Sequence, residues 1–217
     1  GALILGLLTN PDTLGIWRTV RDRLLEDFLP PASATDLERR PSLEAAQTPL
    51  HSLCSSETPG PYHLIGARVS TSASSCSRYR GRGSDGFVLS PLYCGGEATG
   101  WAWTEGWLGG RMTLPTAMAT SAASHNPGAT RYAAAPGGRR LAALTMGLLG
   151  TREGCWTRNP DPTVARPWLW VRPNLLIPGF KQGLLGLGLD ERRAFVELAG
   201  GGAIDELGLY ELLRRCV

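Results

Sequence analysis

The stretch AFVELAGGGAIDELGLYELLRR, residues 194–215, is the most informative part of this chain about its fold. Its first residues, from Ala194 to Leu198, alternate in the manner of a β-strand. Three consecutive glycines, Gly200, Gly201 and Gly202, then make a tight exit from the strand. Such a triplet serves close packing or positive φ angles more often than it serves ligand binding.

A helix is expected to follow the glycines, from about Asp205 to Arg215. Acidic residues at its start and arginines at its end complement the helix dipole. Leu209, Leu212 and Leu213 give it an apolar face. A strand, a glycine turn and a helix in this order predict one edge of an α/β sheet, where ligands gather beyond the carboxyl ends of the strands.

The N-terminal part, residues 1–60, is predicted to be an appendage to the main portion, residues 61–217. Apolar residues recur near helical spacing from Thr13 to Leu29, which predicts an amphipathic helix. The helix ends at Pro30-Pro31, and the following Pro- and Ser-rich stretch is typical of a loop or of a poorly ordered excursion. Because the first residue is Gly1 rather than methionine, we expect the sequence to be a fragment or a processed product.

Within the main portion, residues 62–69 and 86–92 have the composition of β-strands, with a polar connection between them. Residues 94–110 are rich in glycine and tryptophan without a sustained period, and are predicted to form a structured loop. Residues 113–124 are small and apolar and predict a closely packed helix. A second short helix is expected at 141–149, followed by a surface-wrapping segment at 155–178.

Composition limits the partners and the location of the chain. The formal net charge is +3, and no run of five or six like charges forms a polyanion-binding face, so no nucleic-acid partner is expected. The apolar opening from Ala2 to Leu8 is far shorter than the roughly 20 residues that span a bilayer. It also lacks the basic flank of a signal peptide. A location in the cytoplasm or at the periphery of a membrane is therefore expected.

The cysteines and histidines give no sign of a disulfide framework or a metal site. The cysteines are widely spaced, odd in number and without a C-x-x-C pair, and are expected to be free, mostly packed thiols. The histidines have no metal-ligand spacing and are expected to be surface or satisfied residues. No metal and no cofactor is predicted. The cysteines are Cys54, Cys76, Cys94, Cys155 and Cys216, and the histidines are His51, His63 and His125.

Four stretches in the main portion resemble the C-terminal half of bacterial patatin-like phospholipases, in the same order. The last is FVELAGGGAIDELGLYELLRR at 195–215, where the family has a strand, D-G-G-H-F, an acidic residue, Asn and L-G-L-Y-E-L. The others are PYHLI at 61–65, FVLSPLYCG at 87–95 with EATGW at 97–101, and TAMATSAA at 116–123. The resemblance covers the chain from about residue 61 to its end.

The resemblance implies a three-layer α/β/α fold, of which this chain would hold a part, and hydrolysis of acyl esters by a Ser/Asp dyad. In the family the serine sits in a G-x-S-x-G elbow, and a glycine-rich loop supplies backbone N–H groups to the oxyanion. This sequence contains no G-x-S-x-G. The alignment places the family's catalytic aspartate at Gly200, while Gly201 and Gly202 keep its two glycines. A glycine can neither accept a proton nor orient a serine.

Other residues are poor replacements for the missing dyad. Asp205 and Glu206 lie at the start of the helix, where a carboxylate is already explained as a cap or dipole partner. Ser121 matches a family serine outside the elbow and is expected to be a helix-packing residue. Three tryptophans, at 101, 103 and 107, suit either a lipid interface or anchoring in the core or a loop, and anchoring is the more frequent role.

We therefore expect no catalytic residue in this chain, with Gly200, Gly201 and Gly202 marking the positions of the family's active-site loop. The leading hypothesis is a degenerate or truncated patatin-like lipid acyl hydrolase, a pseudoenzyme that is inactive as this chain. The alternative is a non-catalytic module that binds a lipid, an anion or a protein on the same scaffold, and a structural fragment without activity is the third. A lipid or membrane surface and self-association through an open sheet edge are the expected partners. An aspartate is expected to fit at Gly200, facing the former active-site cleft.

Overall fold

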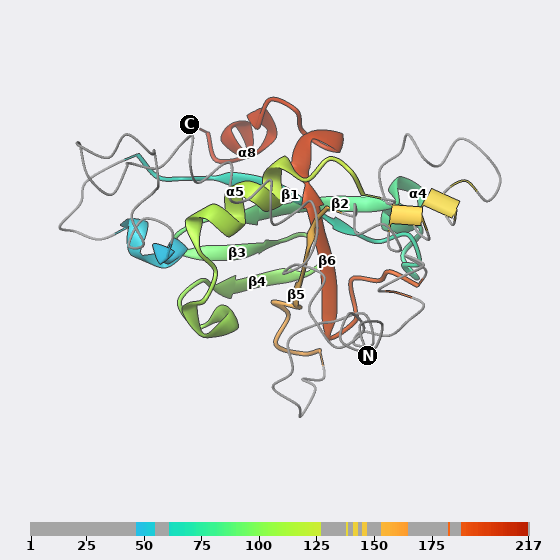
Figure 1. The fold of residues 1–217 in the computed structure, drawn as a ribbon, viewed down its shortest axis with the longest axis horizontal. Coiled ribbons are helices and arrows are strands. Elements are labelled where there is room, and N and C mark those ends of the chain that lie inside the picture. The colour runs from blue at the N-terminus through green and yellow to red at the C-terminus, as the bar shows by residue number, and fades with distance from the viewer. Residues whose placement is uncertain are drawn as a thin grey trace.

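The computed structural model describes residues 47–54, 61–126, 138, 141–142, 145–146, 153–164, 182 and 188–216. A six-stranded sheet forms its centre, with the strands in the order β4-β3-β2-β1-β6-β5 (Figure 1). All of the pairings in this sheet are antiparallel. Because helices accompany this sheet, the chain is a mixed α/β protein, as expected, although β6 lies inside the described sheet rather than at its edge. The strands are β1 (Ile65–Ser70), β2 (Ser84–Leu89), β3 (Tyr93–Gly96), β4 (Gly100–Trp103), β5 (Cys155–Arg158) and β6 (Phe195–Gly200).

Strands β1 and β2 confirm the two strand predictions at 62–69 and 86–92. They pair along their whole length, from Ile65 opposite Leu89 to Ser70 opposite Ser84. The polar connection between them contains a short helix, α4 (Ser77–Arg82). This helix ends at Gly83, whose φ of 73° is the left-handed conformation that suits a glycine after a helix.

The loop prediction for residues 94–110 is wrong over its first half, because β3 and β4 form an antiparallel hairpin there. Gly95 has a φ of 151°, and a Cβ atom at this position would lie 2.1 Å from the carbonyl oxygen of Gly100. Glycine is therefore required for the close approach of the two strands. Each strand has four residues, too few for a sequence period to appear. The hairpin leads to a 3-10 helix, η3 (Trp107–Gly110).

One face of the sheet carries the main core. The predicted helix at 113–124 is confirmed as α5 (Leu114–Ala122), which crosses this face in front of the sheet (Figure 1). Thr113 caps it by accepting a hydrogen bond from the N–H of Thr116. The buried side chains of this core are Leu50, Ala67, Val69, Phe87, Leu89, Cys94, Trp107, Met112, Ala117, Val196 and Leu198.

Part of the N-terminal portion contributes to this core. Residues Leu50–Cys54 form a 3-10 helix, η2, inside the stretch that was predicted to be a loop or poorly ordered. Leu50 is fully buried, and its N–H donates to the carbonyl oxygen of Met112 at 2.8 Å. The boundary predicted at residue 60 therefore does not separate residues 47–54 from the core, because a non-local contact ties them to it.

The opposite face carries a smaller cluster of Trp156, Leu189 and Phe195. Trp156 belongs to β5, which pairs with β6 at the edge of the described sheet. The prediction of a surface segment beginning at Cys155 is thus wrong for this strand, whose first three residues are buried. Strand β5 depends on its hydrogen bonds to β6, which lies in a distant part of the chain. No local sequence pattern therefore predicts this strand.

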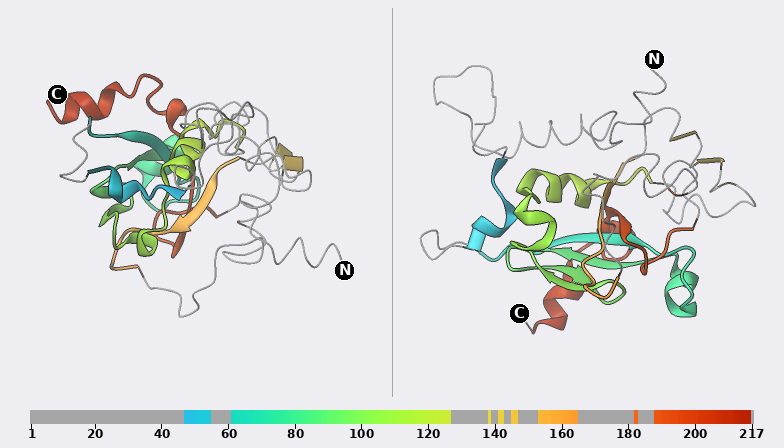
Figure 2. Two further views of the ribbon diagram at one scale, coloured as in Figure 1. Left: turned by 60° about the vertical axis from the view of Figure 1, so that its left-hand side comes forward. Right: turned by 90° about the horizontal axis from the view of Figure 1, so that it is seen from below.

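After β6 the chain forms a 3-10 helix, η5 (Gly201–Ala203), and then α8 (Leu209–Arg214). The predicted helix thus begins later than Asp205. Asp205 instead caps it, because its carboxylate accepts hydrogen bonds from the N–H groups of Leu209 and Tyr210, at 3.2 and 2.8 Å. Helices α5 and α8 lie on opposite sides of the sheet (Figure 2).

Two other predicted elements fall wholly or partly outside the described residues. These are the helix at 13–29 and most of the segment at 155–178. Of the helix predicted at 141–149, the described residues 141–142 and 145–146 are helical. Strands β4 and β5 are the edges of the described sheet, and self-association through such an edge stays a prediction.

Candidate functional site

The glycines predicted to mark an active-site loop are packed tightly against the rest of the domain. A Cβ atom at Gly200 would lie 2.6 Å from the carbonyl oxygen of Ala123 and 2.9 Å from that of Ser121. The N–H of Gly200 donates to the same oxygen of Ala123 at 2.7 Å. A Cβ at Gly201 would lie 2.8 Å from the backbone of Gly66, whereas Gly202 has open space around it.

The expectation that an aspartate fits at Gly200 is therefore wrong. The backbone angles, φ −58° and ψ 134°, suit any residue, but the end of α5 occupies the space that a side chain would need. Close packing, the more frequent reason for such a glycine, applies here. The assignment of Gly200–Gly202 to a family active-site loop stays a prediction.

The remaining candidate residues have structural roles in the described part of the chain. Ser121 lies in α5, and its carbonyl group faces Gly200. Asp205 is the helix cap described above. Trp107 anchors the core: it is 6% exposed, and its indole N–H donates to the carbonyl oxygen of Arg158 at 3.1 Å. Trp101 and Trp103 are exposed at the surface.

A buried polar network, which sequence reasoning missed, joins the end of α5 to the sheet. Arg68 is 1% exposed and donates to the side-chain oxygen of Asn126 at 3.4 Å. The amide nitrogen of Asn126 donates to Glu197 and to the carbonyl oxygen of Glu153, both at 2.9 Å. Glu153 in turn accepts the N–H of His125 at 2.7 Å. Buried charges persist where they are hydrogen-bonded in this way, so the network is a structural feature.

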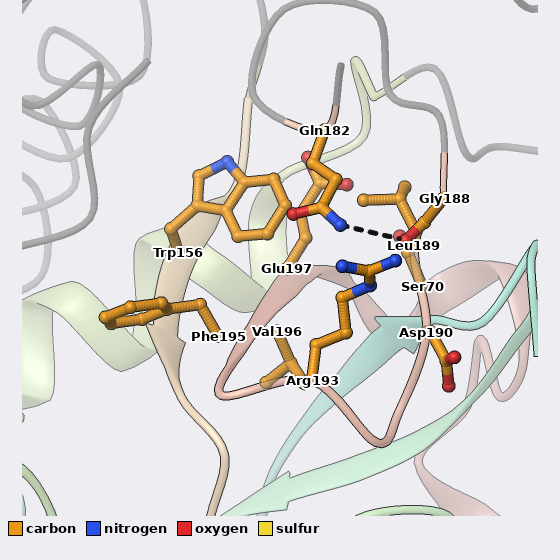
Figure 3. Close-up of a pocket in the computed structure, with 10 residues that line it drawn as sticks. All are labelled: Ser70, Trp156, Gln182, Gly188, Leu189, Asp190, Arg193, Phe195, Val196 and Glu197. Carbon is orange, nitrogen blue, oxygen red and sulfur yellow. Dashed lines mark hydrogen bonds between the residues drawn. The ribbon is translucent and has the colours of Figure 1, made fainter. Parts of the chain in front are cut away.

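A small pocket lies beside this network, and Figure 3 shows the ten residues that line it. The side chains of Gln182, Trp156 and Glu197 converge on it, and Gln182 donates to the carbonyl oxygen of Gly188 at 3.2 Å. The space between the atoms amounts to about 170 Å³, but it contains no void large enough for a water molecule. This pocket is therefore a packing defect rather than a ligand site.

A larger groove lies on the sheet face opposite α5, between β4 and the end of α8. It has a volume of about 320 Å³, which is within the range of small-molecule sites. Its lining combines aromatic side chains, one serine and two arginines. These residues are Tyr62, Ser90, Tyr93, Trp101, Arg214 and Arg215.

The hairpin of β3 and β4 supplies the aromatic wall of this groove. Successive residues of a strand point to opposite faces of the sheet, so Trp101 and Trp103 share the face on which the groove lies. Tyr93 stands directly opposite Trp103, and their ring centroids are 4.6 Å apart. On the other face, Cys94 enters the core and Ala102 packs against it. The alternation of large and small residues at Trp101-Ala102-Trp103 is the sequence pattern from which this aromatic face could have been predicted.

Helix α8 supplies the charge of the groove. The guanidinium carbon of Arg214 lies 5.5 Å from the ring centroid of Trp101, a cation–π contact. Glu211 forms ion pairs with Arg214 at 2.8 Å and with Arg215 at 3.5 Å. One carboxylate thus pairs with two guanidinium groups at this end of the helix.

The apolar face of α8 points away from the molecule. Leu209 is 47% exposed and Leu213 is 66% exposed, whereas the polar side of the helix faces the groove. Leu207, just before the helix, is exposed as well. We call this set, together with the exposed aromatic residues of the hairpin, the apolar surface. Its members are Tyr93, Trp101, Trp103, Leu207, Leu209, Tyr210, Leu212 and Leu213.

Comparison with protein-family models, with curated proteins and with solved structures finds no match to this chain. The resemblance to patatin-like phospholipases therefore stays a prediction based on the sequence. No helix among the described residues combines the length and the apolar character needed to cross a membrane. In the same residues, no group of three or more His, Cys, Asp or Glu side chains is placed to hold a metal ion.

Proposed function

We propose that this chain is a degenerate member of the patatin-like lipid acyl hydrolases that binds an anionic lipid surface without hydrolysing it. The observation that carries this proposal is the apolar surface, which lies beside a groove lined by Arg214 and Arg215. In this proposal the sheet is part of the family's three-layer α/β/α domain, and the lineage rests on the four sequence stretches that resemble the family.

The absence of the dyad supports a non-catalytic role. The sequence has no G-x-S-x-G elbow, and the aligned aspartate position is Gly200, where a side chain would collide with the end of α5. Without a base to activate a serine, no activated nucleophile is available to attack an ester. We expect hydrolysis of p-nitrophenyl acyl esters and of phospholipids to stay at background.

The composition of the apolar surface supports a lipid partner. Tyr and Trp combine an apolar body with a polar tip, which suits the boundary between water and lipid. Arginines beside them match the negative charge of an anionic membrane. A helix that turns its leucines outward is typical of interfacial binding rather than of packing onto its own domain.

Vesicle co-sedimentation tests this proposal. The protein should sediment with vesicles of phosphatidylcholine that contain phosphatidic acid, and Leu213→Gln should weaken this binding. Leu141→Gln is the matched control, because Leu141 is 65% exposed and Leu213 is 66% exposed. The helical residues near position 141 lie far from α8 in every view (Figures 1 and 2). Equal losses in the two variants would overturn the assignment of the surface.

An ester-hydrolysis assay tests the non-catalytic part separately. Turnover that persists through purification and disappears with Ser121→Ala would show that the chain is an enzyme. Background rates in the wild type, together with vesicle binding, are the result that the proposal expects.

A further inference from the structure

We infer that the groove between β4 and α8 binds the phosphate group of an anionic phospholipid, with Arg215 as its main ligand. This inference deepens the proposed lipid-binding function and rests on it. The general attraction of a membrane for positive charge needs no particular site, whereas this inference assigns the phosphate to one groove and to named side chains.

The polar lining selects an anion. Two guanidinium groups line the groove, and none of its lining residues in the described part of the chain is acidic. Glu211, the carboxylate that pairs with both arginines, balances only one of the two positive charges. A bound anion would balance the second. Phosphate suits this role because its oxygens accept the parallel N–H bonds that a guanidinium group donates.

The two arginines have different roles. Arg214 is held by Glu211 through both Nε and Nη2, at 3.2 and 2.8 Å, and its guanidinium group lies over Trp101. Arg215 approaches Glu211 only through Nε, at 3.5 Å. Its two terminal nitrogens donate no hydrogen bond to the described residues. Arg215 therefore has donors to offer, while Arg214 completes the wall of the groove.

The hydroxyl groups in the groove are already engaged. Ser90 donates to the carbonyl oxygen of Tyr93 at 2.5 Å. Its oxygen then accepts from the hydroxyl of Tyr62, at 3.0 Å. With this direction of the two bonds, neither hydroxyl has a proton left for a ligand. The arginines must therefore supply the N–H donors.

The surroundings of the groove favour a phospholipid over a free phosphate ester. The arginines lie at the C-terminal end of the same short helix, α8, that carries the outward-facing leucines. A phosphate at the groove would thus hold the apolar face of α8 at the level of the lipid headgroups, where the leucines can enter the acyl region. A soluble phosphate ester would make no use of these leucines.

The experiment compares Arg215→Gln with Arg192→Gln in the full chain. Arg192 is exposed and precedes β6, at the end of that strand remote from α8 (Figure 1). Both variants lose one positive charge, but only Arg215 lines the groove. Binding to vesicles of phosphatidylcholine with phosphatidic acid should weaken about tenfold in Arg215→Gln. It should change little in Arg192→Gln.

A second experiment adds glycerol 3-phosphate, a soluble headgroup. Tryptophan fluorescence measures its binding to the protein, and release of the protein from vesicles measures its competition with the lipid. Competition that depends on Arg215 supports the phosphate site. Equal weakening of vesicle binding in Arg215→Gln and Arg192→Gln would overturn the phosphate site, because the membrane would then attract positive charge in general and not one groove. If no vesicle binds while glycerol 3-phosphate binds through Arg215, the phosphate chemistry stands, and the lipid function proposed above fails.

Discussion

Replacing Gly200 with alanine should destabilise the protein, because the added methyl group has no space. Its carbon would lie 2.6 Å from the carbonyl oxygen of Ala123 and 2.9 Å from that of Ser121. Both are backbone atoms, so relief requires that β6 and the end of α5 move apart. Overpacking of this kind costs about 1–3 kcal/mol. The movement would also strain the 2.7 Å hydrogen bond between Gly200 and Ala123, so we expect a loss of about 2 kcal/mol.

Urea-induced unfolding measures this loss, and Gly202→Ala is the matched control. Gly202 has no atom within 4 Å of a Cβ and no positive φ. Alanine there should be neutral, or stabilising by about 0.4–1 kcal/mol, because it restricts the unfolded chain. Gly200→Asp should lose at least as much stability as Gly200→Ala. A Gly200→Ala variant within about 0.5 kcal/mol of the wild type would refute the close packing of β6 on α5.

Two further predictions concern ionisable groups. Burial raises the pKa of Asp85, so the folded state holds this proton more tightly than the unfolded state does. The free energy of unfolding should therefore fall as the pH rises from about 4 through the raised pKa, and Asp85→Asn should remove this fall in urea titrations at several pH values. Cys94 is fully buried, and burial raises its pKa, whereas Cys216 is exposed. A maleimide should label Cys216 in the native protein and Cys94 only on unfolding; equally fast labelling of both, in peptide mass spectra, would contradict the burial of Cys94.

The local elements could be read from the sequence where one pattern covers a whole element. Strands β1, β2 and β6 and helix α5 were predicted because apolar, β-branched or alanine residues gather within each of these short segments. Asp205 was predicted to be a cap or a dipole partner, and its carboxylate accepts hydrogen bonds from Leu209 and Tyr210, which lie close to it in the chain. In each case the residues that interact are close together in the chain, and local propensity is sufficient.

The candidate site could not be predicted in this way, because it depends on which distant segments meet. The hairpin of β3 and β4 is recognisable only when Tyr93 is placed opposite Trp103, and this pairing brings the aromatic side chains onto one face. The sequence of α8 shows an apolar and a polar side but does not say which side faces the domain. The fold places Arg214 over Trp101, which leaves Leu213 in water. Likewise, Gly200 has ordinary backbone angles, and only its packing against Ala123, from another part of the chain, excludes a side chain.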